Sequence, residues 1–188
     1  MMKKVSFFLL GAAFLASSLA FVAPKNPKAP ITLAVQSDKS RVDFIGSKAA
    51  DFHTGTFAVK GGSVQVEGGK LVGGSFVIDL ANLKVTDAAG DRLAGHLKSA
   101  DFFDVAKFGE ATYTISSVDY SSATACTING TLNIKGVGVP VSFASNIRSA
   151  SEKGLFGQAY FSLDRTLLGI AYAGPSKDVQ IAVHLFAK

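Results

Sequence analysis

The stretch Leu93–Thr114, LAGHLKSADFFDVAKFGEATYT, decides how the rest of this chain is interpreted. Its first third carries an apolar stripe at helical spacing, formed by Leu93, Ala94 and Leu97. Asp91 is the expected N-terminal cap of this short helix. An aromatic stop, Phe102–Asp104, follows, and a strand pattern begins at Ala111. Because the flanking sequence has the pattern of strands, a single helical insertion predicts a lid or plug at the end of a β-barrel.

Alternation of apolar and polar residues dominates the chain after residue 30. Strands are expected at residues 31–35, 42–46, 54–67, 71–80, 111–116, 124–135, 139–143, 155–165 and 179–187. Gly68–Gly69 is a hairpin turn, and Gly61–Gly62 inside a strand pattern marks a bulge or a sharp bend. Pro140 places at least one end of its strand at an edge or a bulge. About eight or nine short antiparallel strands fit an up-and-down barrel or a sandwich, and we favour the barrel.

The small residues of one strand raise the question of whether this barrel is hollow. An eight-stranded barrel is just wide enough to be filled by side chains or to hold one slim ligand. Gly157 and Ala159 share the strand parity of Phe161 and Leu163, so they would leave room inside. The alternative is that they relieve crowding at a strand crossing, and the pattern alone does not choose between the two.

The first thirty residues are interpreted as lying outside the fold. Lys3–Lys4 precedes an apolar run over residues 5–22, and Ser18–Ala20 supplies the small residues of a signal-peptidase site. The alternative is an uncleaved membrane anchor, although roughly 18 apolar residues are borderline for spanning a bilayer. We therefore expect an exported, periplasmic location and three segments: a signal peptide over 1–20, a Pro-rich linker over 21–30 and one domain over 31–188.

Charge and motif content argue against several classes of function. The formal net charge is +5, or +3 without Lys3–Lys4, and no basic block interleaved with aromatic residues points to nucleic acid. Cys126 is the only cysteine, so it is interpreted as a structural thiol rather than as part of a disulfide or a CxxC redox pair. The three histidines lack HxH or HExxH spacing, so neither a metal nor another cofactor is expected. A GxSxG elbow is absent, so the sequence gives little support to a nucleophilic enzyme.

Five pieces of the chain match, in order and spacing, the pattern of one known family. They are the run Leu93 to Val105, Gly130-x-Leu132-x-Ile134-x-Gly136-Val137, Phe161-x-Leu163-x-Arg165 with Leu168-Gly169-Ile170, Ser40-x-Val42-x-Phe44, and Gly55-x-Phe57. Together they span about Leu33 to Ala187 and resemble the YceI-like family.

The resemblance implies an all-β fold: an antiparallel eight-stranded lipocalin-like barrel with a short helical lid. It also implies an exported bacterial protein whose apolar channel holds a polyisoprenoid or another long-chain lipid. Two positions depart from the family. Phe108–Gly109 stands where the family often has Tyr-Pro or Phe-Pro, so we expect a looser lid. Thr166–Gly169 lacks the acidic residue of the family's Thr-Asp-Phe-Gly, which bears on the polarity of the channel mouth.

Strand parity places a set of apolar side chains inside the barrel as candidate channel residues. They are Phe44, Phe57, Phe76, Ile78, Tyr113, Ile115, Leu132, Phe143, Phe161 and Leu163. A parity shifted by one residue would turn every side chain of a strand outward. Phe102 and Phe103 lie at the barrel end, where at least one ring should point inward, either closing the cavity or packing as ordinary core.

Two polar residues are candidates for the channel mouth. His96 is expected to bond a ligand head group, or else a backbone carbonyl or Asp101. Arg165 shares the inward parity of its strand, and an inward guanidinium must be paired. Its expected partner is Asp101, Asp104 or Asp79, or the phosphate or carboxylate of a ligand.

The leading hypothesis is an exported binding or carrier protein, not an enzyme, that sequesters an isoprenoid or fatty-chain lipid. It is compatible with transient membrane contact and with a homodimer. A second hypothesis is an enzyme that acts on lipid head groups, with His96 and Asp101 as an acid–base pair. A third is a structural or stress-related exported domain with a filled core.

Overall fold

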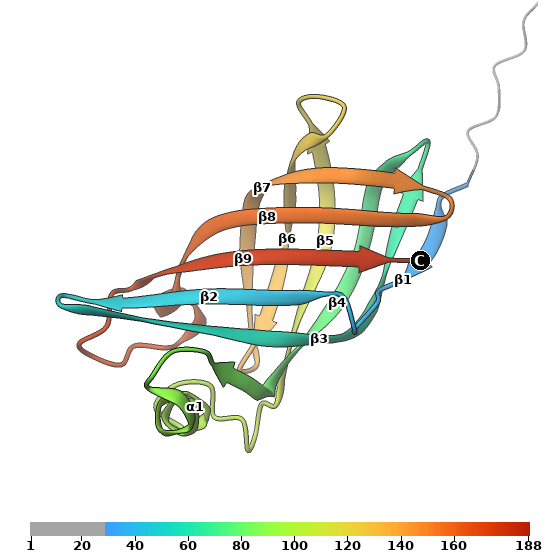
Figure 1. Cartoon of the computed structure of the whole chain (residues 1–188). Coiled ribbons are helices and arrows are strands. Elements are labelled where there is room, and N and C mark those ends of the chain that lie inside the picture. Colours follow the sequence, from blue (N-terminus) through green and yellow to red (C-terminus); the bar gives the residue numbers. More distant parts are fainter. Residues whose placement is uncertain (1–28) are drawn as a thin grey trace, which may run out of the picture.

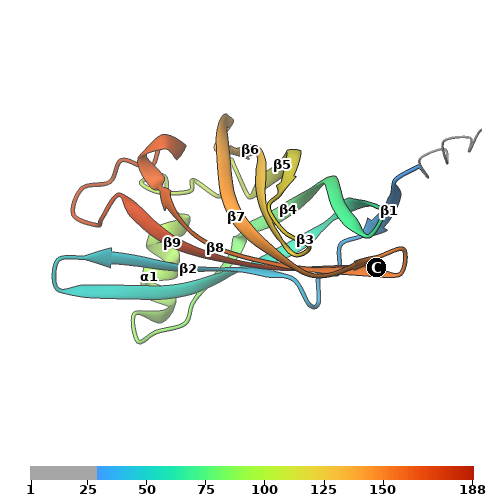
Figure 2. The same cartoon turned by 90° about the horizontal axis from the view of Figure 1, so that it is seen from above.

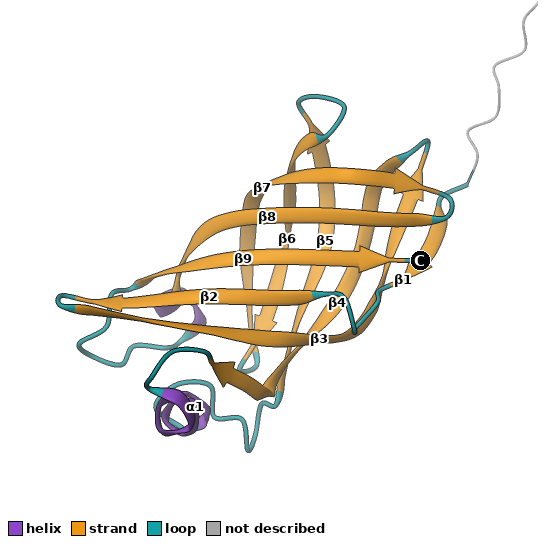
Figure 3. Ribbon diagram, viewed as in Figure 1, coloured by secondary structure: helices purple, strands orange, loops and turns teal. Residues whose placement is uncertain are grey.

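The computed structural model describes residues 29–188, so the expected signal peptide over 1–20 and all but the last two residues of the linker lie outside the described residues. Within 29–188 the chain forms nine strands and two short helices (Figures 1 and 3). They are β1 (Ile31–Ala34), β2 (Arg41–Lys48), β3 (Asp51–Glu67), β4 (Lys70–Val85), α1 (Gly90–Lys98), β5 (Glu110–Tyr120), β6 (Ala125–Ile134), β7 (Val137–Ser151), β8 (Gly154–Asp164), the 3₁₀ helix η1 (Arg165–Leu168) and β9 (Asp178–Ala187). Over the same range, neither helix has the length and apolar character needed to cross a membrane.

Eight of these strands form a closed antiparallel ring. Pairing runs from β3 through β2, β9, β8, β7, β6 and β5 to β4, and β4 pairs with β3 to complete the ring. Figure 1 shows the barrel from the side with α1 at one end, and Figure 2 shows it from above. The prediction of an all-β, antiparallel, eight-stranded barrel with a short helix at its end is confirmed.

The ninth strand, β1, continues the barrel wall where β2 leaves it. Ile31 of β1 lies opposite Val66, in the half of β3 that β2 does not reach, because β2 pairs with residues 51–58. Main-chain hydrogen bonds between Ala34 and Lys188 hold β1 against the end of β9. β1 and β2 therefore occupy the same position in the barrel wall, one after the other along β3.

The bend predicted at Gly61–Gly62 is present in β3. The pairing register with β4 shifts between Val59 and Gly61, and Gly62 has a φ of +135°. A Cβ at Gly62 would collide with the main-chain oxygen of Ser75. Glycine therefore lets the two long strands bend and approach each other closely at this point.

One seam of the barrel wall, near the helical end, has no ladder between its strands. β7 begins at Val137 but pairs with β8 only from Ser145, which lies opposite Ala159. Between these unpaired segments the rings of Phe143 and Phe161 stack, with centroids 4.4 Å apart. Pro140 lies in the unpaired part of β7, so the prediction that it marks an edge is confirmed, and side chains rather than main-chain hydrogen bonds close the wall there.

The end of the barrel away from α1 is filled by side chains. A Cβ at Gly157 would lie 3.2 Å from Cδ1 of Ile147, and Ala159 is buried. The space left inside the barrel there is about 30 Å³ and is lined by residues of β4 to β9. Gly157 and Ala159 therefore leave little free space inside the barrel, which favours the second alternative, relief of crowding.

Helix α1 is anchored by Asp87 rather than by Asp91. The Asp87 carboxylate accepts hydrogen bonds from the main-chain N–H groups of Ala89 (2.8 Å) and Thr54 (2.7 Å), and these bonds lower its pKa. Asp91 lies inside the first turn, and the N-cap residue Ala89 has no side-chain cap. The predicted cap was wrong, because the Asp87 carboxylate, just before the helix, bonds both the start of the helix and β3.

We expect Gly130→Ala to destabilise the barrel. A methyl group there would lie 2.6 Å from Cζ of Tyr113 and would press against the main-chain oxygen of Thr114. Such overpacking lowers the free energy of unfolding by about 1–3 kcal/mol, which urea denaturation measures. Gly46→Ala is the matched control, because a methyl group there meets no atom within 4 Å. Equal stability of the two variants would contradict this packing.

Candidate ligand-binding cavities

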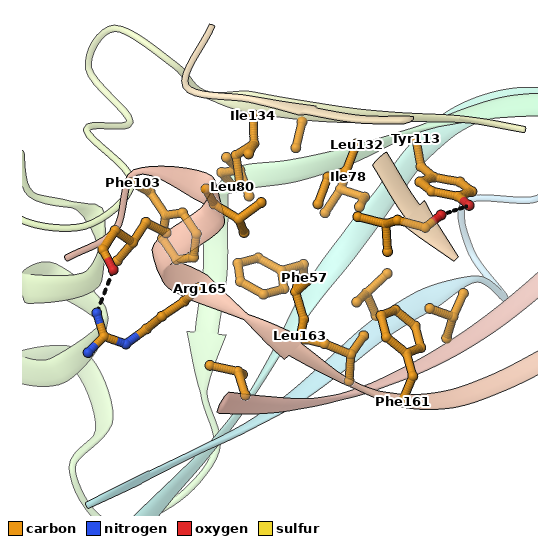
Figure 4. Close-up of a pocket in the computed structure, with 18 of the residues that line it drawn as sticks. Phe57, Ile78, Leu80, Phe103, Tyr113, Leu132, Ile134, Phe161, Leu163 and Arg165 are labelled. Carbon is orange, nitrogen blue, oxygen red and sulfur yellow. Dashed lines mark hydrogen bonds between the residues drawn. The ribbon is translucent and has the colours of Figure 1, made fainter. Parts of the chain in front are cut away.

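The inner cavity lies inside the barrel and has a volume of about 120 Å³. Its walls are the inward faces of the strands together with η1 (Figure 4). Among the described residues, Tyr113 and Arg165 are the only lining residues whose side chains are not hydrocarbon. The Tyr113 hydroxyl donates a hydrogen bond to the main-chain oxygen of Val141 (2.9 Å), and burial raises the pKa of Tyr113 to about 12. The cavity therefore offers almost nothing but hydrocarbon to a ligand.

The outer cavity lies between the barrel end and α1 and has a volume of about 140 Å³. Its walls are the hairpin of β2 and β3, one face of α1, the Phe102–Phe103 pair and the segment that leads into β9. Its polar lining residues are Ser47, Lys48, His53, Arg165 and Ser176. A main-chain hydrogen bond from Ser176 to Ser47 (2.7 Å) fixes the hairpin against the segment before β9.

Phe57 and Phe103 separate the two cavities. Their rings meet edge to face with centroids 5.6 Å apart, and both residues line both cavities. An apolar cavity of roughly 150 Å³ holds a molecule the size of benzene, whereas pockets for drug-sized ligands span about 300–1,000 Å³. Each cavity therefore matches a short hydrocarbon segment, and a long chain fits only if it runs through both after these rings rotate.

Arg165 forms part of the lining of both cavities and binds the segment that leads into β9. Its guanidinium donates hydrogen bonds to the main-chain oxygens of Ile170, Tyr172, Pro175 and Ser176. It forms no ion pair with any residue in 29–188, so the expected pairing with Asp101, Asp104 or Asp79 was wrong. The inward direction of the side chain was predicted correctly, since Arg165 is 8% exposed and lines both cavities.

His96 lies beside the cavities and lines neither of them. Its Nε2 is 3.4 Å from a carboxylate oxygen of Asp101, which is one of the alternatives expected from the sequence. Its ring packs edge to face against Phe102 and Tyr172, with centroids 5.0 and 5.1 Å away. Phe102 is buried under this cluster, while Phe103 is the ring that separates the cavities.

The structure brings most of the predicted site residues together. The inner cavity is lined by Phe57, Phe76, Ile78, Phe103, Tyr113, Leu132, Phe143, Phe161, Leu163 and Arg165. Phe44 and Phe102 line the outer cavity, and Ile115 lines the filled end of the barrel. The sequence analysis did not include Val179 and Ile181 among the channel residues, although the alternation of apolar and polar residues in β9 could have indicated them. It also did not include Lys48 and His53, for which the sequence contains no such pattern.

The remaining titratable groups are dispersed. Cys126 is buried, and burial raises its pKa. His53 and His184 lie near separate aspartates, Asp87 at 3.4 Å and Asp43 at 3.8 Å. Within residues 29–188, no three His, Cys, Asp or Glu side chains gather in a way that could hold a metal ion.

A closed antiparallel barrel with an apolar interior and a helix beside one end is a lipocalin-like architecture. The family model of the YceI-like domain matches residues 33–187, and the chain belongs to this family. The resemblance found in the sequence motifs is therefore confirmed.

Solved structures share the fold. BcnA of Burkholderia cenocepacia superposes with a TM-score of 0.70 at 19% identity, over 82% of this chain and 99% of that one. A polyisoprenoid-binding domain of Saccharophagus degradans, implicated in plant cell wall breakdown, gives 0.64 at 18% identity, over 83% and 97%. The YceI protein of Campylobacter jejuni gives 0.53 at 14% identity, over 95% and 99%. A search of curated proteins found no match.

Replacing Arg165 by lysine should loosen the segment that leads into β9. Lysine keeps the charge but cannot reach four carbonyl oxygens at once, so we expect the free energy of unfolding to fall by at least about 2 kcal/mol. Urea denaturation measures the loss. Arg148→Lys is the control, because Arg148 is exposed and makes one side-chain hydrogen bond to Gln158. A loss no larger in the Arg165 variant than in the control would show that the four bonds add no stability.

Tyr113 should make the barrel sensitive to alkali. Its pKa of about 12 in the folded state exceeds its ordinary value of 10.0, so the unfolded chain releases the phenolic proton more readily. The stability that this group contributes is therefore complete below pH 10 and is lost as the pH rises through about 12. Urea denaturation at a series of pH values should show that the free energy of unfolding falls more steeply with rising pH for the unmodified protein than for Tyr113→Phe. Parallel curves would refute this assignment.

Proposed function

We propose that this protein is an exported, non-enzymatic carrier that shelters the chain of a polyisoprenoid or another long-chain lipid inside its barrel. The observation that carries the proposal is the inner cavity, whose lining is hydrocarbon except for Arg165 and the satisfied hydroxyl of Tyr113. Membership of the YceI-like family and the likeness in fold to a polyisoprenoid-binding domain support it.

Burial of hydrocarbon provides the driving force for such binding. Each CH₂ group moved from water into the barrel contributes roughly 0.8 kcal/mol. Ten such groups outweigh several kcal/mol of lost motion and ordering on association. No covalent step is needed, and specificity follows from the length of the combined cavities and from the polar groups at their outer end.

The two alternative functions receive less support from the site. The His96–Asp101 pair, considered as an acid–base pair of an enzyme, lines neither cavity, so a lipid head group in the barrel would not meet it. A filled core agrees with the barrel end around Gly157 but not with the two cavities at the helical end. Export rests on the pattern of residues 1–20, and transient membrane contact would accompany loading of a lipid.

Filling the junction between the cavities should weaken the binding of a hydrocarbon chain. Val179 lines both cavities, so Val179→Phe would obstruct the path of a chain. We expect the affinity for farnesol, measured by isothermal titration calorimetry, to fall at least about tenfold. Val137→Phe is the matched control, because Val137 is 45% exposed and lines neither cavity.

Native mass spectrometry of the protein purified from its own host should show a co-purified lipid. The absence of that lipid, together with no farnesol binding by the unmodified protein, would overturn the carrier proposal.

A further inference from the structure

We propose that three aromatic residues inside the barrel, Phe76, Tyr113 and Phe143, form the floor of the inner cavity and limit how much of a hydrocarbon chain the protein shelters. The inference rests on the proposed carrier function and adds to it the residues that determine chain length. Beyond the floor lies the far space, a volume of about 30 Å³ at the filled end of the barrel.

The three rings lie between the inner cavity and the far space. Among the described residues, those that line both spaces are Phe76, Tyr113, Phe143 and Val183. They belong to β4, β5, β7 and β9, so they approach from several sides of the barrel. In Figure 4 Tyr113 lies at the end of the pocket opposite Phe103. The floor therefore closes the inner cavity at its end away from α1.

Ring contacts join the floor into one layer. The ring centroids of Phe76 and Tyr113 are 5.8 Å apart, and those of Tyr113 and Phe143 are 5.4 Å apart. Phe143 in turn stacks on Phe161 of β8. All three floor residues are buried. A row of rings in contact across the interior obstructs a chain that runs along the barrel axis.

Tyr113 holds the floor in place. Its hydroxyl donates a hydrogen bond to the main-chain oxygen of Val141, and its ring packs against the main chain at Gly130. Rotation of the ring would leave a buried hydroxyl and a carbonyl without their bond, which costs free energy. Phe57 and Phe103 carry no polar group of this kind. The floor is therefore a fixed stop, whereas the rings between the two cavities can turn aside.

The far space offers a chain little room beyond the floor. Its volume of about 30 Å³ is far below the roughly 150 Å³ of a cavity that holds benzene. Ile147 of β7 and Leu155 of β8 are buried around it. Carbons in excess of those that fill the inner and outer cavities therefore stay in water. Affinity should rise with chain length up to a limit and then stay level.

The experiment measures the affinity of the protein for linear alcohols of increasing length. The purified, delipidated full chain is titrated in a calorimeter with the series from hexanol to dodecanol, each below its solubility limit, and with farnesol. We expect each added carbon to tighten binding about fourfold until the chain fills both cavities. Beyond that length, within the same series, further carbons should leave the affinity unchanged.

A matched pair of variants locates the limit. Phe76→Ala removes one ring of the floor and should raise the ratio of the affinities for dodecanol and hexanol at least about fourfold, the effect of one more sheltered carbon. Ile147→Ala is the control, because Ile147 is equally buried but lines only the far space, and it should leave the ratio unchanged. Phe76→Leu keeps more of the buried volume, so it is expected to fold even if Phe76→Ala does not, and it should raise the ratio in the same direction.

The outcomes separate this inference from the carrier function. A fourfold gain per carbon that continues undiminished to dodecanol in the unmodified protein would overturn the floor and leave the carrier function intact. An unchanged ratio in the Phe76 variants would also overturn it, as would an equal rise in Ile147→Ala, because the far space would then be open to the chain. Failure of every alcohol and of farnesol to bind would overturn the carrier function itself.

Discussion

Arg165 donates hydrogen bonds to four main-chain oxygens between Ile170 and Ser176, and the helical end of the barrel depends on them. A buried guanidinium without a carboxylate partner is tolerated only where carbonyl dipoles surround it. Here those carbonyls belong to the irregular segment that leads from η1 into β9. The same bonds therefore satisfy the charge, order the segment and place one cation at the boundary between the two cavities.

Contacts between distant segments hold the rest of the helical end together. Asp87 ties the start of α1 to β3, and Ser176 ties the segment before β9 to β2. The wall between β7 and β8 is closed there by the stacked rings of Phe143 and Phe161, since the strands are not paired at this point. A side chain can rotate without breaking a main-chain ladder. Phe143 and Phe161 line the inner cavity, so rotation of their rings would open its wall to a chain.

Much of the fold and of the inner cavity could be predicted from the alternation of apolar and polar residues. Successive side chains of a strand point to opposite faces of the sheet, so residues two apart share a face. That rule placed Phe57, Phe161 and Leu163 correctly inside the barrel. The family motifs then added the helical end, which periodicity alone only suggested as a lid.

The parts that could not be predicted depend on contacts between distant, irregular segments. The carbonyl partners of Arg165 lie in a segment with no periodic pattern, so an acidic partner was the natural but wrong expectation. The place of Lys48 and His53 in the outer cavity depends on how far the β2–β3 hairpin extends beyond the barrel, and the Ala49–Ala50 turn carries no glycine or proline signal. A crystal structure of the protein with farnesol tests most directly the claim that one hydrocarbon chain runs through both cavities. We predict continuous density from the outer to the inner cavity, with the rings of Phe57 and Phe103 turned aside. Density confined to the surface, with both rings in place and both cavities empty, would contradict it.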